Sequence, residues 1–205
     1  MHIDDVYYWN LLMQHKTLLL ERNKQIDVFD GVFPLTWRSN ALEFIKASKF
    51  TIGWGDSGVP ERQAHDHFIH SEFNTEDIER FGILEHINQY PEITKLVEGL
   101  DLRFAMVNLA NMSDVNFVHA HNQKKVMLYY VNLVWNEGAH GETQFYSEDL
   151  KSIQYTTPYT PGRLIVFDAD IPHTIRPQSI IGPKYRFTYA MIYDTKVTHD
   201  MIYNT

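Results

Sequence analysis

The stretch "FVHAHNQKKVMLYYVNLVWNEGAHGETQFY", residues 117–146, carries the most informative pattern in the chain. His119 and His121 are separated by one residue within a β-forming segment, so in a strand both side chains point to the same side. The following run "VMLYYVNLVW" is rich in branched and aromatic residues, which is typical of a buried strand. A third histidine, His140, comes just before Gly-Glu-Thr. The stretch therefore predicts successive β-strands with two imidazoles on one face.

A further histidine, His173, lies 52 residues beyond His121 in "PGRLIVFDADIPHTIRP". There a Pro-Gly turn opens a strongly apolar strand, and the histidine follows a short loop. Two histidines on a strand more often face solvent than bind a metal. A distal third histidine makes a shared metal site the hypothesis to test.

The spacing pattern of the apolar residues changes near residue 101. Before it, four segments show helical spacing, cap residues or helix-starting proline: 5–24, 39–48 (cap at Ser39 or Asn40), 74–89 (cap at Asn74 or Thr75) and 91–99. After it come short strand-like segments separated by turn residues. This order indicates an α+β protein, in which residues 1–100 are mainly helical support and residues 101–205 form a β core. We expect the helices to cover one face of a twisted sheet or barrel and to leave the other face for a pocket.

Composition limits the classes of function. A chain of 205 residues predicts a single domain, 1–205, and its net charge of −8 disfavours a nucleic-acid partner. With no cysteine, any metal must have nitrogen and oxygen ligands. No apolar run approaches the ~18 residues of a membrane span, and the N-terminus lacks the features of a signal peptide. We therefore expect a soluble, cytoplasmic protein; its oligomeric state cannot be predicted from these features.

Taken together, the motifs of residues 103–194 resemble the Fe(II)/2-oxoglutarate-dependent dioxygenases of the prolyl-hydroxylase-like branch. "HAH" stands where that family has His-x-Asp, and "YYVNLVW" is similar to its Tyr-Leu-Asn-x-x-Trp strand. "HGETQFY" resembles its Gly-Gly-Glu-Thr-x-Phe turn, and "TPGRLIVFDADIPHTIRP" its strand and loop with the distal histidine. "YRFTYAMIY" is similar to the strand with Arg-x-Ser/Thr. The resemblance implies a double-stranded β-helix (jelly roll) supported by N-terminal helices.

The resemblance also implies cofactors: iron(II), the co-substrate 2-oxoglutarate, and dioxygen. It places the metal on His119, His121 and His173. It places the far carboxylate of 2-oxoglutarate on Arg186, with Arg176 as the competing arginine. The 2-oxoglutarate site is completed by two hydroxyl groups, those of Tyr130 and Thr188. The implied substrate is a protein side chain or a small metabolite, which the sequence does not specify further.

One position departs from the family pattern, because its carboxylate ligand would fall at position 121, which is histidine here. Three interpretations stay open. The site could use three histidines, it could take a carboxylate from elsewhere, or the chain could be a degenerate binding module without the metal. The carboxylates available to the second interpretation are Asp114, Glu142, Asp168 and Asp170.

Two other enzyme classes also use three histidines. A cupin-like oxygenase would need a glutamate four or five residues after the second histidine, where this chain has Lys125 and Val126. A zinc hydrolase would not explain Arg186 and Tyr130.

Two further regions are candidates for contact with substrate. His140, Arg176 and Glu142 could line the pocket, and residues 50–73, with His65, His67 and His70, could form a lid.

Overall fold

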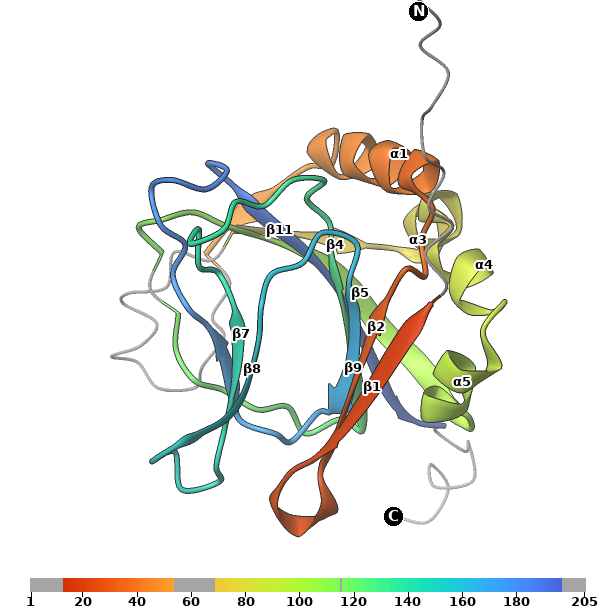
Figure 1. Cartoon of the computed structure of the whole chain (residues 1–205). Helices are drawn as coiled ribbons and strands as arrows, with labels where there is room; N and C mark the ends of the chain where they lie inside the picture. Colours follow the sequence, from red (N-terminus) through yellow and green to blue (C-terminus); the bar gives the residue numbers. More distant parts are fainter. Residues whose placement is uncertain (1–12, 54–68, 115, 197–205) are drawn as a thin grey trace, which may run out of the picture.

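The computed structural model describes residues 13–53, 69–114 and 116–196, which fold into two facing β-sheets with helices on one outer side (Figure 1). The large sheet contains, in spatial order, β1 (Gln14–Leu19), β2 (Gln25–Asp30), β9 (Leu164–Asp168), β6 (Lys125–Tyr130), β11 (Arg186–Thr195), β5 (Leu100–Ala110), β4 (Ile69–Phe73) and β3 (Thr51–Ile52). The small sheet contains β10 (His173–Ile175), β7 (Thr143–Tyr146) and β8 (Ile153–Thr157). Neighbouring strands in both sheets are antiparallel. This arrangement confirms the predicted double-stranded β-helix.

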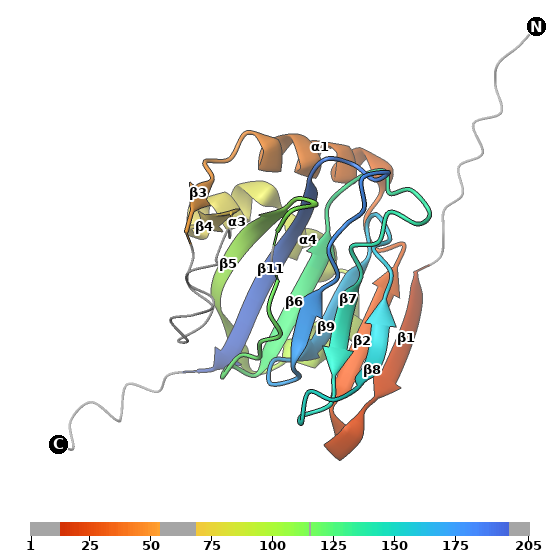
Figure 2. The same ribbon diagram turned by 90° about the vertical axis from the view of Figure 1, so that its left-hand side faces the viewer.

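The helices cover the outer face of the large sheet, and the small sheet lies in front of its inner face (Figure 2). The helical elements are α1 (Leu35–Lys46), α3 (Thr75–Phe81), α4 (Ile83–Ile87) and α5 (Pro91–Thr94), with short 3-10 turns at η1 (Glu21–Asn23) and η2 (Lys95–Val97). The prediction that helices cover one face is therefore confirmed, and the prediction of a pocket on the other face stays a prediction. No helix among the described residues is long and apolar enough to cross a membrane.

Strand alternation divides the core into two parts. On β6, Tyr129 packs with the helix-side cluster around Phe33 and Trp37, whereas Tyr130 belongs to the cluster between the two sheets. Both tyrosines are fully buried. Because successive side chains of a strand point to opposite faces, one short run of residues fills both layers.

The prediction of a helix over 5–24 is wrong for its described part, because residues 14–19 form β1. All six residues of β1 pair with β2, and Leu18 packs against the cluster between the sheets. The hydrogen-bonded pairing with β2 therefore determines the conformation of this segment, although its apolar residues show a spacing that also occurs in helices. Residues 5–12 lie outside the described part of the chain. The first hundred residues therefore contribute strands as well as helices.

The remaining helices are close to their predicted positions, with differences at their ends. α1 begins at Leu35, directly after Pro34, so the predicted cap at Ser39 or Asn40 is wrong. The cap at Asn74 is confirmed, and its side chain and that of Asp77 form a reciprocal capping box. The predicted helix 74–89 is interrupted at Gly82, whose φ of 70° ends α3 and starts α4.

Candidate active site

Three histidines meet in the interior between the two sheets. The potential ligand atoms of His119, His121 and His173 all lie within 4.8 Å of one another. His173 is the first residue of β10, and its backbone exchanges two hydrogen bonds with that of His119, at 3.0 and 2.8 Å. The backbone N–H of His121 donates to the carbonyl of Ala169 at 2.8 Å. Main-chain bonds thus bring the ligands together from distant parts of the sequence, although residues 117–121 do not form the regular strand that we predicted.

The orientation of two of these rings is fixed by the backbone. Nδ1 of His119 lies 3.1 Å from the carbonyl oxygen of Phe117, and Nδ1 of His173 lies 2.8 Å from that of Ile171. A carbonyl can only accept, so each Nδ1 carries the proton and donates it. Nε2 of each ring is then left with its lone pair, as a metal ligand requires.

Burial keeps two of the three imidazoles in the state that binds metals. Burial, together with the neighbouring His119, lowers the pKa of His121 to about 4. Burial is also the main reason that the pKa of His173 lies well below its usual value. Both imidazoles are therefore neutral at pH 7, and neutral imidazole is the form that coordinates a cation. The donor set fits a divalent transition metal such as iron(II).

The carboxylates that could have completed the site are engaged elsewhere. Asp114 caps its own turn at Asn111, and Asp170 pairs with Lys24. Asp168 pairs with Lys125 at 2.7 Å and also accepts a backbone hydrogen bond. Among the described residues, the cluster contains imidazoles only.

Arg186 lies on the same interior and is only 1% exposed. Its Nε donates to the carbonyl of Gly141 at 2.9 Å, and its Nη2 lies 3.4 Å from Oγ1 of Thr143. Nη1 is buried without a hydrogen-bond partner, and the described residues give this guanidinium no carboxylate. A buried charge of this kind needs an anion, and a carboxylate fits the guanidinium fork.

Aromatic and hydroxyl groups complete the surroundings of Arg186. The guanidinium carbon lies 4.8 Å from the ring centre of Tyr159 and 5.3 Å from that of Tyr130. Burial raises the pKa of Tyr130, so its phenol stays protonated and donates to Thr143 at 2.7 Å. Oγ1 of Thr188, two residues along β11 from Arg186, is buried and has no hydrogen-bond partner among the described residues. Arg186, Tyr130 and Thr188 thus lie close together on the inner face of the large sheet.

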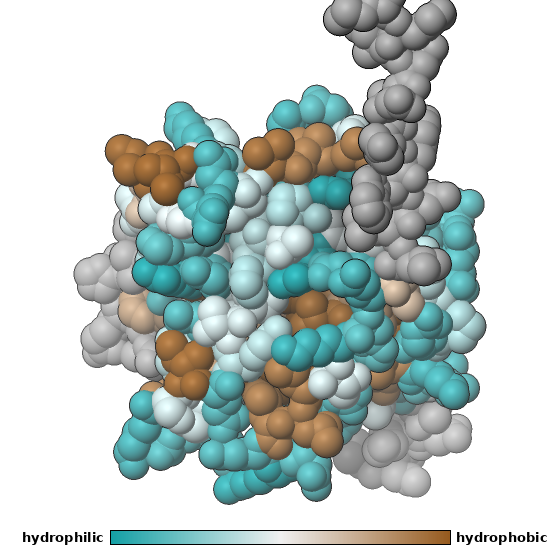
Figure 3. Space-filling model, in the orientation of Figure 1, coloured by the Kyte–Doolittle hydropathy of each residue, from teal (hydrophilic) through white to brown (hydrophobic). Residues whose placement is uncertain are grey.

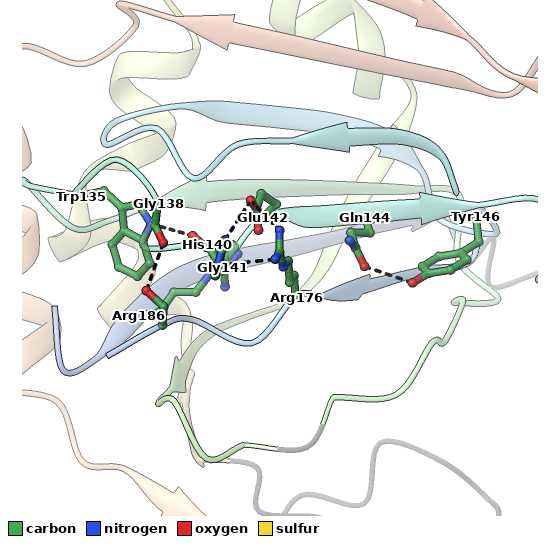
Figure 4. A network of polar contacts seen from close by, with 10 residues as sticks. Trp135, Gly138, His140, Gly141, Glu142, Gln144, Tyr146, Arg176 and Arg186 are labelled. Atoms are coloured by element: carbon green, nitrogen blue, oxygen red, sulfur yellow. Dashed lines mark hydrogen bonds and ion pairs between the residues drawn. The ribbon is translucent and has the colours of Figure 1, made fainter. Parts of the chain in front are cut away.

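The turn before β7 holds the arginine from the other side (Figure 4). Gly141 has a φ of 81°, and a Cβ there would lie 2.8 Å from the ring of Trp135. The Trp135 indole N–H donates to the carbonyl of His140 at 2.7 Å. Trp135 therefore fixes the turn whose next carbonyl accepts from Arg186.

His140, Arg176 and Glu142 form a half-exposed cluster next to this turn (Figure 4). The carboxylate of Glu142 lies 3.6 Å from Arg176 and 3.8 Å from His140. Glu142 directly precedes β7, and the other oxygen of its carboxylate is buried without a hydrogen-bond partner among the described residues. Arg176 is 47% exposed at its side chain, whereas Arg186 is buried, which favours Arg186 as the carboxylate anchor.

Of the segment predicted as a lid, 50–73, residues 54–68 lie outside the described part, including His65 and His67. His70 lies on β4 and is buried. The prediction of a lid stays a prediction.

Two residues that the sequence analysis did not assign support Arg186 through the backbone. Asn132 accepts from the N–H of Phe187 at 2.9 Å and donates to the carbonyl of Tyr185 at 2.9 Å, so it holds both neighbours of Arg186. The hydroxyl of Tyr159 lies 2.7 Å from Asn132 and 2.5 Å from the carbonyl of Phe187. Asn132 lies inside the "YYVN" motif and could have been noticed there, whereas Tyr159 sits in a loop without any pattern.

No family model matches the sequence, and no curated protein matches it significantly. Comparison with solved structures, in contrast, finds many similar folds. A prolyl hydroxylase from Trichoplax adhaerens, solved with a hypoxia-inducible-factor peptide, has a TM-score of 0.62 and 13% identity, over 82% of this chain and 83% of that one. A prolyl-4-hydroxylase from Pseudomonas putida has a TM-score of 0.58 and 13% identity, over 83% and 92%. HygX from Streptomyces hygroscopicus, solved with nickel and 2-oxoglutarate, has a TM-score of 0.61 and 10% identity, over 86% and 89%.

The chain has the fold of the 2-oxoglutarate- and Fe(II)-dependent oxygenases of the prolyl-hydroxylase-like type. The resemblance drawn from the motifs is thereby confirmed for the fold. The site residues are a separate matter, because identities of 10–16% do not transfer the roles of individual side chains.

Proposed function

We propose that this protein is a non-haem iron(II), 2-oxoglutarate-dependent oxygenase that hydroxylates a protein side chain or a small metabolite. The observation that carries the proposal is the presence, in one interior, of a three-imidazole cluster and a buried arginine that forms no ion pair within the described part of the chain. A cation site and an anion site so arranged fit a metal together with a dicarboxylate co-substrate. When bound, iron(II) and 2-oxoglutarate supply oxygen activation, in which 2-oxoglutarate is converted to succinate and carbon dioxide while the substrate is hydroxylated.

The residues have separate tasks in this proposal. His119, His121 and His173 hold the metal as neutral ligands, and the carbonyls of Phe117 and Ile171 fix two of their rings. We take the three-histidine interpretation because the cluster contains no carboxylate from the described residues, and Asp114, Asp168 and Asp170 have other partners.

On the other side of the interior, Arg186 binds the far carboxylate of 2-oxoglutarate through the face of its guanidinium that has no partner. Thr188 adds a hydroxyl from the same strand, and Tyr130 shapes the space beneath the guanidinium. The rings of Tyr130 and Tyr159 and the turn at Gly141 exclude water around the arginine, which strengthens its attraction for a carboxylate.

The solved relatives include enzymes that act on protein and on small molecules. One is in complex with a peptide, and another is an epimerase of nogalamycin biosynthesis. Both substrate classes therefore stay within the proposal.

An anaerobic titration with iron(II) and then 2-oxoglutarate tests the proposal directly. We expect a visible charge-transfer band of the chelate in wild type and its loss in His173→Ala and His121→Ala. His140→Asn is the matched control, because this histidine lies outside the cluster and asparagine tolerates its φ of 58°. Iron binding without a band would instead indicate a three-histidine oxygenase, cupin-like, that does not use 2-oxoglutarate. No iron binding would indicate a binding module and would overturn the proposal.

A further inference from the structure

A row of four polar side chains crosses the inner face of the large sheet beside the candidate active site. In the register of the sheet, Tyr130 lies opposite Thr188, Thr188 opposite Asn108, and Asn108 opposite His70. Directly opposed residues of antiparallel strands project to the same face. Tyr130 belongs to the cluster between the sheets, so all four side chains point into that interior.

The row lies between the two ends of the candidate site. Thr188 follows Arg186 by two residues on β11, roughly 7 Å at the rise of a strand. The histidines lie toward the other end of β11. The backbone of His121 bonds to the residue that follows β9. The last residue of β9 is in register with Lys125 of β6, which in turn is in register with Tyr193 near the end of β11. Arg186, Thr188 and the histidines thus define an axis.

Asn108 and His70 lie to one side of this axis, on β5 and β4, toward the edge of the large sheet (Figure 2). We call these two residues the lateral branch. A co-substrate that extends from Arg186 to the histidines would occupy the axis. The lateral branch is then additional polar surface that the co-substrate does not need.

The branch contains a buried hydrogen-bond acceptor that the described residues leave without a partner, and so does the neighbouring part of the axis. Oδ1 of Asn108 is buried and accepts no hydrogen bond from the described residues, and the same holds for Oγ1 of Thr188. A buried polar group that is left unpaired is unfavourable, so these groups favour a ligand that supplies the missing hydrogen bonds. A carboxamide such as Asn108 offers one acceptor and two donors side by side.

The groups of the branch are uncharged. Asn108 cannot ionise, and burial lowers the pKa of His70, which keeps its imidazole neutral at pH 7. The next inner-face pair along these strands is Met106 opposite Glu72, and Glu72 is exposed. The buried part of the branch therefore suits a neutral polar group and not a second carboxylate.

We propose that Asn108 and His70 form the subsite for the primary substrate, and that the group bound there is a neutral amide, as in a peptide bond or a carboxamide side chain. This inference rests on the proposed function, which gives the axis to 2-oxoglutarate. The paired donor and acceptor of Asn108 match those of an amide, and a site built in this way discriminates strongly against an analogue that cannot form the same bonds.

Saturation-transfer NMR with N-acetylalaninamide as the probe tests the subsite. N-acetylalanine, which has a carboxylate in place of the terminal amide, is the comparison ligand. The protein is loaded with zinc(II), which is diamagnetic, and with 2-oxoglutarate, so that the axis is filled. We expect saturation transfer to the amide in wild type and at least a threefold loss in Asn108→Leu, which keeps the size and removes the hydrogen bonds. Asn40→Leu, on the exposed side of α1, is the matched control and should keep the full signal.

The anaerobic iron and 2-oxoglutarate titration of the same variants separates this inference from the proposed function. A normal charge-transfer band in Asn108→Leu together with the lost amide signal supports the subsite. A weakened band with an unchanged amide signal assigns Asn108 to the co-substrate and overturns the inference, as does an equal amide signal in wild type and Asn108→Leu. If wild type shows no band, the proposed function fails, while the amide measurement on metal-free protein still decides the subsite. Asn108→Asp, which keeps the shape but adds a charge, serves if Asn108→Leu does not fold, and it should also lose the amide signal.

Discussion

At the scale of single residues, Arg186 is the most informative side chain, because it is a buried charge that forms no ion pair with any of the described residues. Two rings, one carbonyl and one hydroxyl surround it, and none of these neutralises it. Burial lowers the pKa of Arg186, yet a guanidinium stays protonated in proteins. The energetic cost of the buried charge indicates a bound anion more strongly than any motif does.

Arg186→Ala should keep iron binding and reduce the affinity for 2-oxoglutarate by roughly 10- to 100-fold, since a charge-assisted hydrogen bond contributes about 1.5–3 kcal/mol. Calorimetric titration of 2-oxoglutarate into the metal-loaded variant measures the change. Arg176→Ala is the matched control and should bind 2-oxoglutarate as wild type does. Equal losses in both variants would contradict the assignment of the anchor.

Gly141→Ala should reduce the free energy of unfolding by about 1–3 kcal/mol, because the new Cβ combines an unfavourable φ with a contact to Trp135. The same shift would move the carbonyl that accepts from Arg186, so the affinity for 2-oxoglutarate should fall as well. Urea unfolding and calorimetry measure the two effects. A fully stable variant with weakened binding would show that the turn tolerates the side chain and serves only to place Arg186.

At the scale of elements, the contact between the neighbouring strands β6 and β11, at the end where Arg186 lies, determines the position of this arginine. Asn132 replaces a regular sheet bond at the point where the strands separate, and it bonds to the backbone on both sides of the arginine. Tyr159, from the loop between β8 and β9, closes the same network. One side chain therefore joins three segments.

Asn132→Ala should reduce the free energy of unfolding by about 2–4 kcal/mol, because it leaves several buried backbone and hydroxyl groups unpaired. Asn132→Asp should lose less stability, since aspartate keeps the acceptor oxygen for the N–H of Phe187 and the hydroxyl of Tyr159. Thermal and urea unfolding of both variants provide the comparison. If Asp destabilises as much as Ala, the acceptor is not the important half of this side chain.

The elements also show which features could be predicted from sequence. The strands β5, β6, β8, β9 and β11 were predictable because each is a dense run of branched and aromatic residues. β1 was not, because only Leu18 among its residues is drawn into the core, and its strand conformation depends on pairing with β2. The convergence of His119 and His173 follows from tertiary hydrogen bonds, and only the family motifs indicated it.

At the scale of the whole molecule, the site lies between two sheets whose outer sides differ. Helices cover the large sheet, while the face shown in Figure 3 has mostly polar side chains with separate apolar patches, among them one over α1 and one over the loop before β11. The exposed apolar residues there include Leu35, Ile180 and Ile181.

Iron(II) should stabilise the whole fold, because it binds the folded histidine cluster and the unfolded chain lacks that cluster. At a concentration 100 times its dissociation constant, a ligand adds about 2.7 kcal/mol, which corresponds to roughly 5–11 °C in a chain of this size. Scanning calorimetry under argon checks this expectation. His173→Ala should melt at the same temperature with and without iron.

His121→Asp tests the charge of the site, because it introduces the ligand type of the related family. We expect this variant to bind iron at least as well as wild type, since a carboxylate attracts the cation more than a neutral imidazole does. Iron titration of both proteins measures the difference. Loss of binding in the variant would mean that the positions of the backbone suit the longer imidazole and not aspartate.

The two hydrogen bonds that join His119 and His173 have a consequence for the metal-free protein. They hold two ligands at their final spacing through the main chain, so this part of the site exists before the ion arrives. The amide protons of both residues should exchange slowly with deuterium in the absence of metal. Capture of the ion then requires little rearrangement of the chain, and its rate should be set by how quickly the ion reaches the interior and loses its water.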